Sequence, residues 1–159
     1  MKKFYLFIVI VVLLSGCVFK EVRNQSSPMS AVQDDNSKEA GKTVKINDRE
    51  IKVEIADTPE SQYKGLSFKE NLCVDCGMLF KFSEKSEKTF VMRNMNFPLD
   101  IIFIDDEKIV KIEKNLKPEG ENPKNFYNSS APVDYVLEVN AGYVDSHNIK
   151  IGDKIIFSL

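Results

Sequence analysis

Hydrophobic and polar residues alternate with a period of two over much of the chain after residue 42, which is the pattern of strands with one buried face. Residues 43–56 show the pattern on either side of Asn47-Asp48 and therefore predict a β-hairpin. The same alternation recurs over residues 78–82, 90–92, 109–114, 135–139 and 149–157. In residues 109–114 it places Val110 and Ile112 inward. Residues 99–104 are almost all apolar instead, as expected of a strand buried on both faces.

Two short helices are expected between these strands. Thr58 is placed to cap the first, Pro59 stands at its first position, and Gly65 is placed to end it. Asn140 is expected to cap the second helix, which runs to about His147. The remaining long segment, residues 115–132, holds three prolines and one glycine. A loop of this length is uncommon in a compact domain unless it is functional or mobile.

Seven or eight short strands with two short helices predict a mainly β domain. The expected architecture is a β-sandwich of the jelly-roll kind or a small barrel. Residues 42–159 are enough for one domain with a core, which we expect to be a monomer. Lysines and acidic residues are interspersed, the formal net charge of the chain is −2, and there is no basic block. We therefore expect no nucleic-acid partner.

The beginning of the chain has the pattern of a bacterial lipoprotein signal. Lys2 and Lys3 precede an apolar run over residues 4–14, which is too short for a bilayer span but typical of the core of a signal peptide. The next residues, Ser15-Gly16-Cys17, complete a sequence that resembles a lipobox, in which the cysteine is lipidated and becomes the first residue. An ordinary signal peptide, or a membrane anchor that contains Cys17, is the alternative.

We therefore expect residues 1–16 to be a lipoprotein signal peptide and Cys17 to carry a lipid, with palmitate among its acyl chains. Two or more chains anchor a protein stably, whereas one does so only marginally. Residues 17–41 are polar and poor in large apolar residues, which predicts a flexible tether. The domain would then lie outside the cytoplasm, held by its lipid at the cell membrane or the outer membrane.

Several strings in the domain carry a family resemblance. They are TPESQYKGLSF, GMLFKF, MRN followed by PLDIIFID, YVLEVNAG and IGD. Through them, residues 52–157 resemble the domain of unknown function 192 family. The resemblance implies a compact, mostly β fold of the sandwich or jelly-roll kind, commonly behind a signal peptide, and no established activity. Two positions depart from the family pattern, because Val91 stands where Trp is usual and Met95 where Thr is usual.

Polar residues embedded in these apolar motifs are the candidates for a site. Four of them are Asn94, Asp100, Glu138 and Asn140. In the structural interpretation, Asn94 and Asp100 hold the connection around Pro98 and Asn140 caps a helix. In the functional interpretation, a cleft beside residues 115–132 is lined by Lys64, Arg93, Asn94, Asp100, Ser129 and Asn140.

Cys73 and Cys76 form a C-x-x-C pair, which is compatible with a structural disulfide, a redox pair or half of a metal site. The pair lies in a loop and the chain has no second pair, so we favour a disulfide. A sharper alternative joins these cysteines to Met78, Met92 and Met95 in a Cu(I) site, because thiolate and thioether ligands select soft metals. Methionine at inward strand positions usually fills a core, so we expect no metal and no cofactor.

The residues do not favour an enzyme. There is one histidine, no Ser-His-Asp arrangement and no phosphate-binding glycine motif. We expect a binding or accessory module of the cell envelope, whose partner is an unidentified ligand or envelope protein. The first alternative is a small enzyme that acts on an envelope carbohydrate or peptide with Asp100 as general acid or base. That alternative requires Asp100 in a solvent-accessible cleft with a perturbed pKa. The second alternative is a Cu(I)-binding module.

Overall fold

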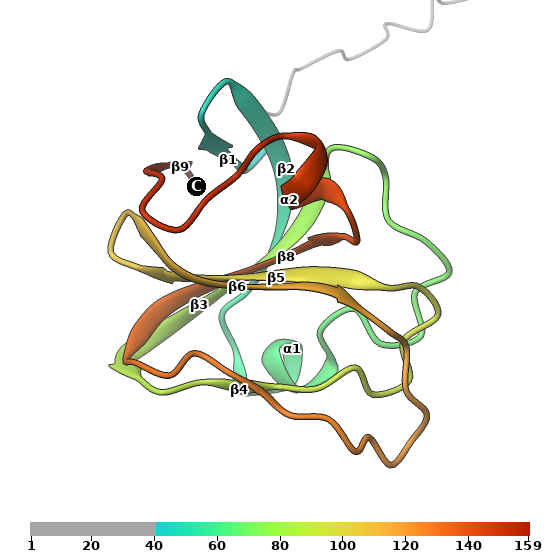
Figure 1. Ribbon diagram of the computed structural model, residues 1–159. Helices are drawn as coiled ribbons and strands as arrows, with labels where there is room; N and C mark the ends of the chain where they lie inside the picture. The colour runs from blue at the N-terminus through green and yellow to red at the C-terminus, as the bar shows by residue number, and fades with distance from the viewer. Residues whose placement is uncertain (1–40) are drawn as a thin grey trace, which may run out of the picture. The chain divides into compact units, whose positions relative to one another are not determined.

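The computed structural model describes residues 41–159 (Figure 1). The signal peptide over residues 1–16, Cys17 and nearly all of the tether over residues 17–41 lie outside the described residues. The described part is mainly β with two short helices, as predicted. The elements are β1 (Thr43–Ile46), β2 (Arg49–Ala56), α1 (Pro59–Lys64), β3 (Cys76–Ser86), β4 (Thr89–Phe90), β5 (Leu99–Asp105), β6 (Lys108–Leu116), β7 (Tyr127–Asn128), β8 (Val133–Asn140), α2 (Tyr143–Ser146) and β9 (Ile155–Ser158).

Seven strands form one curled sheet in the order β6-β5-β8-β3-β2-β1-β9, and β4 pairs with β7 separately (Figure 1). The pairs in the large sheet are antiparallel, except that β2 and β3 run parallel. The two edges of the sheet are also linked: Ile155 N donates to Glu107 O at 2.8 Å, and Ile109 N donates to Asp153 O at 3.0 Å. The sheet is therefore curled into a partial barrel, in agreement with the predicted small barrel or sandwich.

Both faces of the central strands are buried. One face, with Leu79, Ile102 and Leu137, packs inside the curl against β1, β9 and α2, and we call this cluster the inner core. The other face, with Phe80 and Phe103, packs under α1, β4 and their connecting segments, and we call this cluster the outer core. Residues 99–104 of β5 are buried throughout, which confirms the strand that the apolar run predicted. The second of these cores contains the candidate site.

The β1–β2 hairpin and helix α1 form as the sequence predicts. Asn47 takes a φ of +53° in the hairpin turn. Thr58 caps α1: its Oγ1 accepts a hydrogen bond from Ser61 N at 3.2 Å, and Ser61 Oγ accepts one from Thr58 N at 3.0 Å. Gly65 ends the helix with a φ of +51°, a conformation that glycine adopts without the strain of a Cβ atom. These elements are fixed by local chemistry.

The inward positions of β6 differ from the prediction. Phe103 pairs with Lys111 but Ile104 pairs with Ile109, so Val110 is an extra residue in β6. Such a bulge interrupts the alternation of faces. Ile109 is therefore fully buried in one core, whereas Val110 and Ile112 are half-buried against different cores. The predicted pattern missed this because periodicity alone does not show a bulge.

Two further predictions are corrected by contacts distant in the sequence. Gly142, not Asn140, is the residue that precedes helix α2, and the Asn140 amide donates instead to the carbonyls of Leu72 and Cys73, at 3.2 and 2.9 Å. Residues 115–132 are not one structureless loop, because they contain β7 and a bridge from Glu119 to Arg93. Leu116 belongs to the outer core, and Tyr127 packs against it.

Cys73 and Cys76 are joined by a disulfide in the segment between α1 and β3. Val74, inside this small loop, is one of the exposed apolar residues of the domain. No helix found in residues 41–159 is both long enough and apolar enough to cross a membrane.

Candidate functional site

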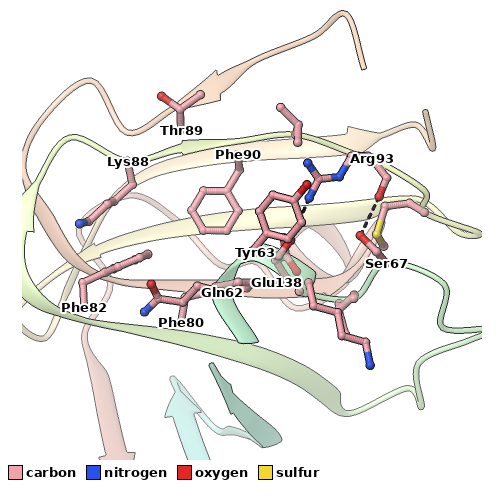
Figure 2. A pocket seen from close by; sticks show the side chains of 15 residues that line it. Gln62, Tyr63, Ser67, Phe80, Phe82, Lys88, Thr89, Phe90, Arg93 and Glu138 are labelled. Atoms are coloured by element: carbon pink, nitrogen blue, oxygen red, sulfur yellow. Dashed lines mark hydrogen bonds between the residues drawn. The ribbon is translucent and has the colours of Figure 1, made fainter. Parts of the chain in front are cut away.

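A pocket of about 270 Å³ opens between α1, its exit segment, β3 and β4, and β8 contributes to its floor (Figure 2). We call it the Glu138 pocket. Its walls include the aromatic side chains of Tyr63, Phe80, Phe82 and Phe90. The volume is near the lower end of small-molecule sites, which span about 300–1,000 Å³. A small organic molecule of a few carbon atoms with one or two polar groups would fit this space.

Glu138 is the acidic residue of this pocket. It stands in β8 between Met78 of β3 and Ile101 of β5, and its side chain lies on the same face of the sheet as Phe80. The residue is 5% exposed, and its Oε2 has no hydrogen-bond partner among residues 41–159. Burial raises the pKa of the Glu138 carboxyl from 4.5 to about 8. The group is therefore protonated over much of the neutral range.

Two glycines allow the chain to approach Glu138 closely. A Cβ atom on Gly65 would lie 3.3 Å from Phe80 Cζ and 4.0 Å from Glu138 Oε2, so a larger residue would take space beside the carboxyl. At Gly77 a Cβ atom would lie 2.7 Å from the Glu138 carbonyl oxygen. Gly77 therefore lets β3 pair closely with β8 at this level. The position of Glu138 is set by the sheet itself and not by a loop.

Three basic residues, Lys64, Lys88 and Arg93, also line the pocket. The Arg93 guanidinium lies 4.0 Å from the centre of the Tyr63 ring, and its Nη2 donates to Tyr63 O at 3.0 Å. The Lys88 ammonium lies 4.0 Å from the centre of the Phe82 ring. Figure 2 shows Arg93 and Lys88 on either side of Phe90. The aromatic rings therefore hold two cations at separate places around the pocket.

The structure brings only part of the predicted cleft together. Lys64 and Arg93 line the Glu138 pocket, and they also line a neighbouring surface hollow that includes Asn94. Asn94 takes a φ of +51°, and its carbonyl accepts a hydrogen bond from Phe68 N at 2.9 Å. The Asn94 backbone thus joins the segment that carries Arg93 to the segment that follows α1.

The other predicted residues lie elsewhere. Asp100 is fully buried on the opposite face of the sheet, where its carboxylate accepts hydrogen bonds from Asn115 N at 2.8 Å and Val144 N at 3.0 Å. Ser129 is buried and accepts a hydrogen bond from Lys88 N at 3.1 Å. Asn140 holds the segment before the disulfide, as described above. The expectation of Asp100 in a solvent-accessible cleft is corrected: it is a packed residue that joins β5 to β6 and α2.

The sequence shows Glu138 as an embedded polar residue, but its pattern predicts neither the place of Glu138 in the pocket nor the aromatic walls and Lys88. The sequence does mark Glu138 as a candidate, because it is the one charged residue within the otherwise apolar string YVLEV. A lone acid at an inward strand position is the pattern to look for. Val91 and Met95, the two departures from the family pattern, both line this pocket as well.

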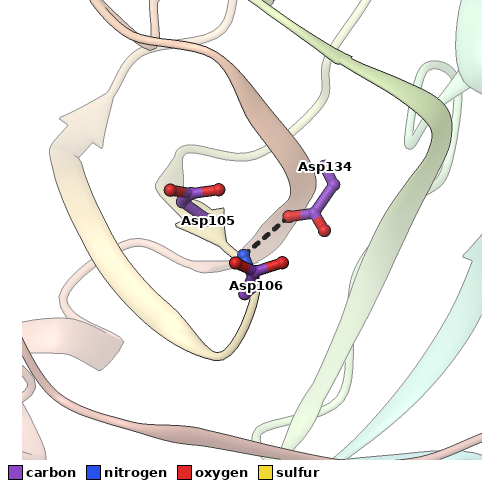
Figure 3. A group of neighbouring side chains, drawn as sticks. All are labelled: Asp105, Asp106 and Asp134. Carbon is purple, nitrogen blue, oxygen red and sulfur yellow. Dashed lines mark hydrogen bonds between the residues drawn. The ribbon is translucent and has the colours of Figure 1, made fainter.

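Asp105, Asp106 and Asp134 form a second cluster of titratable groups, at the turn between β5 and β6 (Figure 3). Lys85 Nζ lies 2.6 Å from Asp105 Oδ1 and 2.8 Å from Asp106 Oδ1. These hydrogen bonds raise the pKa of Lys85 well above its usual range. Asp134 Oδ1 accepts a hydrogen bond from Asp106 N at 2.9 Å. The ion pairs with Lys85 and the hydrogen bond to Asp134 account for this cluster as part of a surface turn.

The residues of the Cu(I) alternative are engaged otherwise in this structure. Cys73 and Cys76 are bonded to each other, so neither offers a thiolate. Met78, Met92 and Met95 are buried among the apolar residues of the outer core. Their placement is that of core methionines.

Comparisons with known proteins identify a matching family and similar proteins. The family described as DUF192, an uncharacterized ACR, matches residues 42–157. A UPF0127 protein of Thermococcus sibiricus is 27% identical over 104 residues, which cover 65% of this chain and 64% of that protein. The chain thus spans slightly less than two thirds of the length of this curated relative.

Two crystal structures are similar to the described domain. One, from Sinorhizobium meliloti, is described as a putative transcription regulator and has a TM-score of 0.69 at 32% identity, covering 73% of this chain and 92% of its own. The other, a protein of unknown function from Novosphingobium aromaticivorans, has a TM-score of 0.66 at 34% identity, covering 72% and 83%. These relatives define the fold and the family, and the function must be argued from the pocket.

Proposed function

The chain belongs to the DUF192 family, which is uncharacterized, and we propose that its domain is a binding module that holds a small organic molecule in the Glu138 pocket. The observation that carries this proposal is the buried Glu138 carboxyl, whose Oε2 lacks a partner among residues 41–159. Buried polar groups in native proteins are nearly always hydrogen-bonded, and leaving one unpaired costs about 1–3 kcal/mol. A ligand that donates a hydrogen bond to Glu138 would remove this cost.

The pocket has the composition of a binding site. Aromatic and aliphatic side chains share its walls with polar ones, and the polar groups come from different elements, for example Lys64 from α1 and Arg93 from the segment after β4. Small-molecule sites likewise combine apolar walls with placed polar groups. Because Glu138 stands on a central strand, the polar group at the floor is held rigidly.

We further propose that the module is held at the cell envelope by a lipid on Cys17. The lipobox-like sequence around Cys17 supports this. Mass spectrometry of the mature protein tests it: the expected N-terminal peptide begins at Cys17 and carries acyl chains. A mature protein with an unmodified Cys17 would contradict the anchor and leave the pocket proposal intact.

The binding proposal is tested by a fragment screen on the full chain, followed by ¹H–¹⁵N NMR. The expected result is that some fragments shift the amide signals of Glu138 and of the Gly65 region together. Val91→Trp, which introduces the residue usual in the family at a position lining the pocket, should weaken these fragments at least about tenfold by filling the space. If no fragment perturbs the lining residues, the proposal is wrong.

A second candidate function, a small enzyme, is favoured by one observation. The raised pKa of Glu138, about 8, is suited to a general acid or base near neutral pH. The residue with this role would be Glu138 and not Asp100, which has no access to solvent. Chemical conversion of a fragment that binds the pocket, lost in Glu138→Gln while binding persists, would establish catalysis. Unchanged fragments after long incubation would favour the binding module.

A further inference from the structure

The polar groups of the Glu138 pocket are divided by charge. One carboxyl, that of Glu138, lies at the buried floor, and three cationic side chains, Lys64, Lys88 and Arg93, lie around it. Within residues 41–159, none of these three cations forms an ion pair with a carboxylate. The pocket is therefore complementary to a molecule that has a cationic group to meet the acid and an anionic group to meet the bases.

The floor of the pocket favours a cationic nitrogen. Burial is the cause of the raised pKa of Glu138, and no charged group of the described chain offsets it. An ammonium group next to Oε2 would supply both a hydrogen-bond donor and a compensating charge. A hydroxyl or amide would supply only the donor. The aromatic rings of Phe80 and Phe90 beside it would add favourable contacts with a cation.

The cations favour an anionic group at the other end of the ligand. Lys88 and Arg93 are each held against an aromatic ring, so their positions are restricted before any ligand binds. The hydrogen bond from Arg93 to Tyr63 O uses one N–H of a guanidinium that has five. The remaining N–H groups suit a carboxylate or phosphate. A simple amine would be repelled by these cations, and a simple anion would leave Glu138 without a partner.

We propose that the ligand of the Glu138 pocket is a small zwitterion, with its ammonium group on Glu138, its anionic group at Arg93, and its apolar body against the phenylalanine rings. This rests on the proposed binding function and names the chemical class of the ligand. Binding pairs the ammonium with an ionised Glu138, so the proton that the free carboxyl carries at neutral pH passes to the buffer. The other titratable groups that line the pocket are Tyr63, Lys64, Lys88 and Arg93.

The experiment uses matched probes on the full chain. Unbranched ω-amino acids of four to eight carbons are compared by calorimetry with the amines and the carboxylates of the same length. The expected result is that at least one ω-amino acid binds at least about tenfold more tightly than either counterpart. At pH 7 its binding enthalpy should change with the ionisation enthalpy of the buffer, which indicates proton release.

Variants assign the two ends of the ligand. Glu138→Gln keeps the shape of the side chain and should remove both the proton release and the preference for an amine. Arg93→Gln should remove the preference for the carboxylate while proton release persists. Glu50→Gln, an exposed acid on β2, is the matched control and should change neither. The buffer dependence is measured on the wild-type chain, so the proposal stays testable even where a variant fails to fold.

The outcomes separate this inference from the binding function. ω-Amino acids that bind no more tightly than their amines or carboxylates, while uncharged fragments occupy the pocket, would contradict the zwitterionic ligand. The proposed binding function would be retained in that case. If neither fragments nor probes perturb the lining residues, the binding function itself is wrong. Tight zwitterion binding without release of a proton would also overturn the assignment of the ammonium to Glu138.

Discussion

Two acidic residues, Asp100 and Glu138, are buried in neighbouring strands of the same sheet but on its opposite faces. Asp100 pairs in register with Val139, whose side chain is in the inner core, whereas Glu138 pairs with Ile101 of the outer core. The carboxylate of Asp100 accepts hydrogen bonds from two backbone amides, those of Asn115 and Val144. The Oε2 of Glu138 has none within the described chain.

This difference separates a structural acid from a candidate functional one. Two hydrogen bonds from backbone N–H groups offset the free-energy cost of burying a carboxylate. They also join distant segments, here β5, the end of β6 and α2. A buried carboxyl without a partner costs stability and needs another explanation. The pocket beside Glu138 gives that explanation.

The largest expected effect is that of Asp100→Ala. The substitution leaves the amides of Asn115 and Val144 buried without an acceptor, and we expect the free energy of unfolding to fall by about 3–5 kcal/mol. Urea unfolding followed by circular dichroism measures this. A loss below about 1 kcal/mol would show that Asp100 does not hold these segments together.

The pH dependence of stability is expected to show the next largest effect. Because the pKa of Glu138 is raised from 4.5 to about 8 on folding, the folded state holds a proton that the unfolded state releases in this window. This contribution to stability is complete below pH 4.5 and is lost as the pH rises to about 8. The expected decline is up to about 1.4 kcal/mol per pH unit.

Urea unfolding of the wild-type chain and of Glu138→Gln at several pH values isolates this contribution. The difference between the two curves removes the other titrating groups, which both proteins share. The wild-type chain should lose stability relative to the variant as the pH rises. Parallel curves between pH 5 and pH 8 would mean that Glu138 titrates alike in the folded and unfolded chains.

A smaller gain is expected for Glu138→Met. Methionine fills a similar volume without a buried carboxyl, so the free energy of unfolding at pH 8 should rise by about 1–2 kcal/mol. Thermal unfolding at pH 8 measures it, with Glu50→Met on the exposed side of β2 as the control for the general effect of the residue type. A destabilised Glu138→Met variant would indicate that the carboxyl has a stabilising partner in the folded protein.

The sequence predicted those parts of the fold that depend on neighbouring residues. The β1–β2 hairpin, the cap of α1 at Thr58 and the doubly buried strand β5 all follow from local composition and periodicity. The bulge at Val110 and the role of Asn140 did not, because both depend on partners brought together by the sheet.

The candidate site was predicted only in part for the same reason. Arg93 and Lys64 were expected in it and line the pocket. Asp100 and Glu138 both appear in the sequence as single acids within apolar runs, and no local pattern shows which of them meets backbone amides and which meets a cavity. That distinction depends on Val144 and Asn115, 44 and 15 residues from Asp100 in the chain.

The most direct measurement is a ¹³C NMR titration of the Glu138 side-chain carboxyl in the wild-type protein without added ligand. The signal is assigned by its absence in Glu138→Gln. An unpaired carboxyl at the floor of the pocket should titrate with a midpoint near pH 8. Addition of the best-binding ω-amino acid should then lower this midpoint, because the ammonium stabilises the ionised form. A midpoint near 4.5 in the free protein would contradict the account, since the carboxyl would then be solvated or already paired.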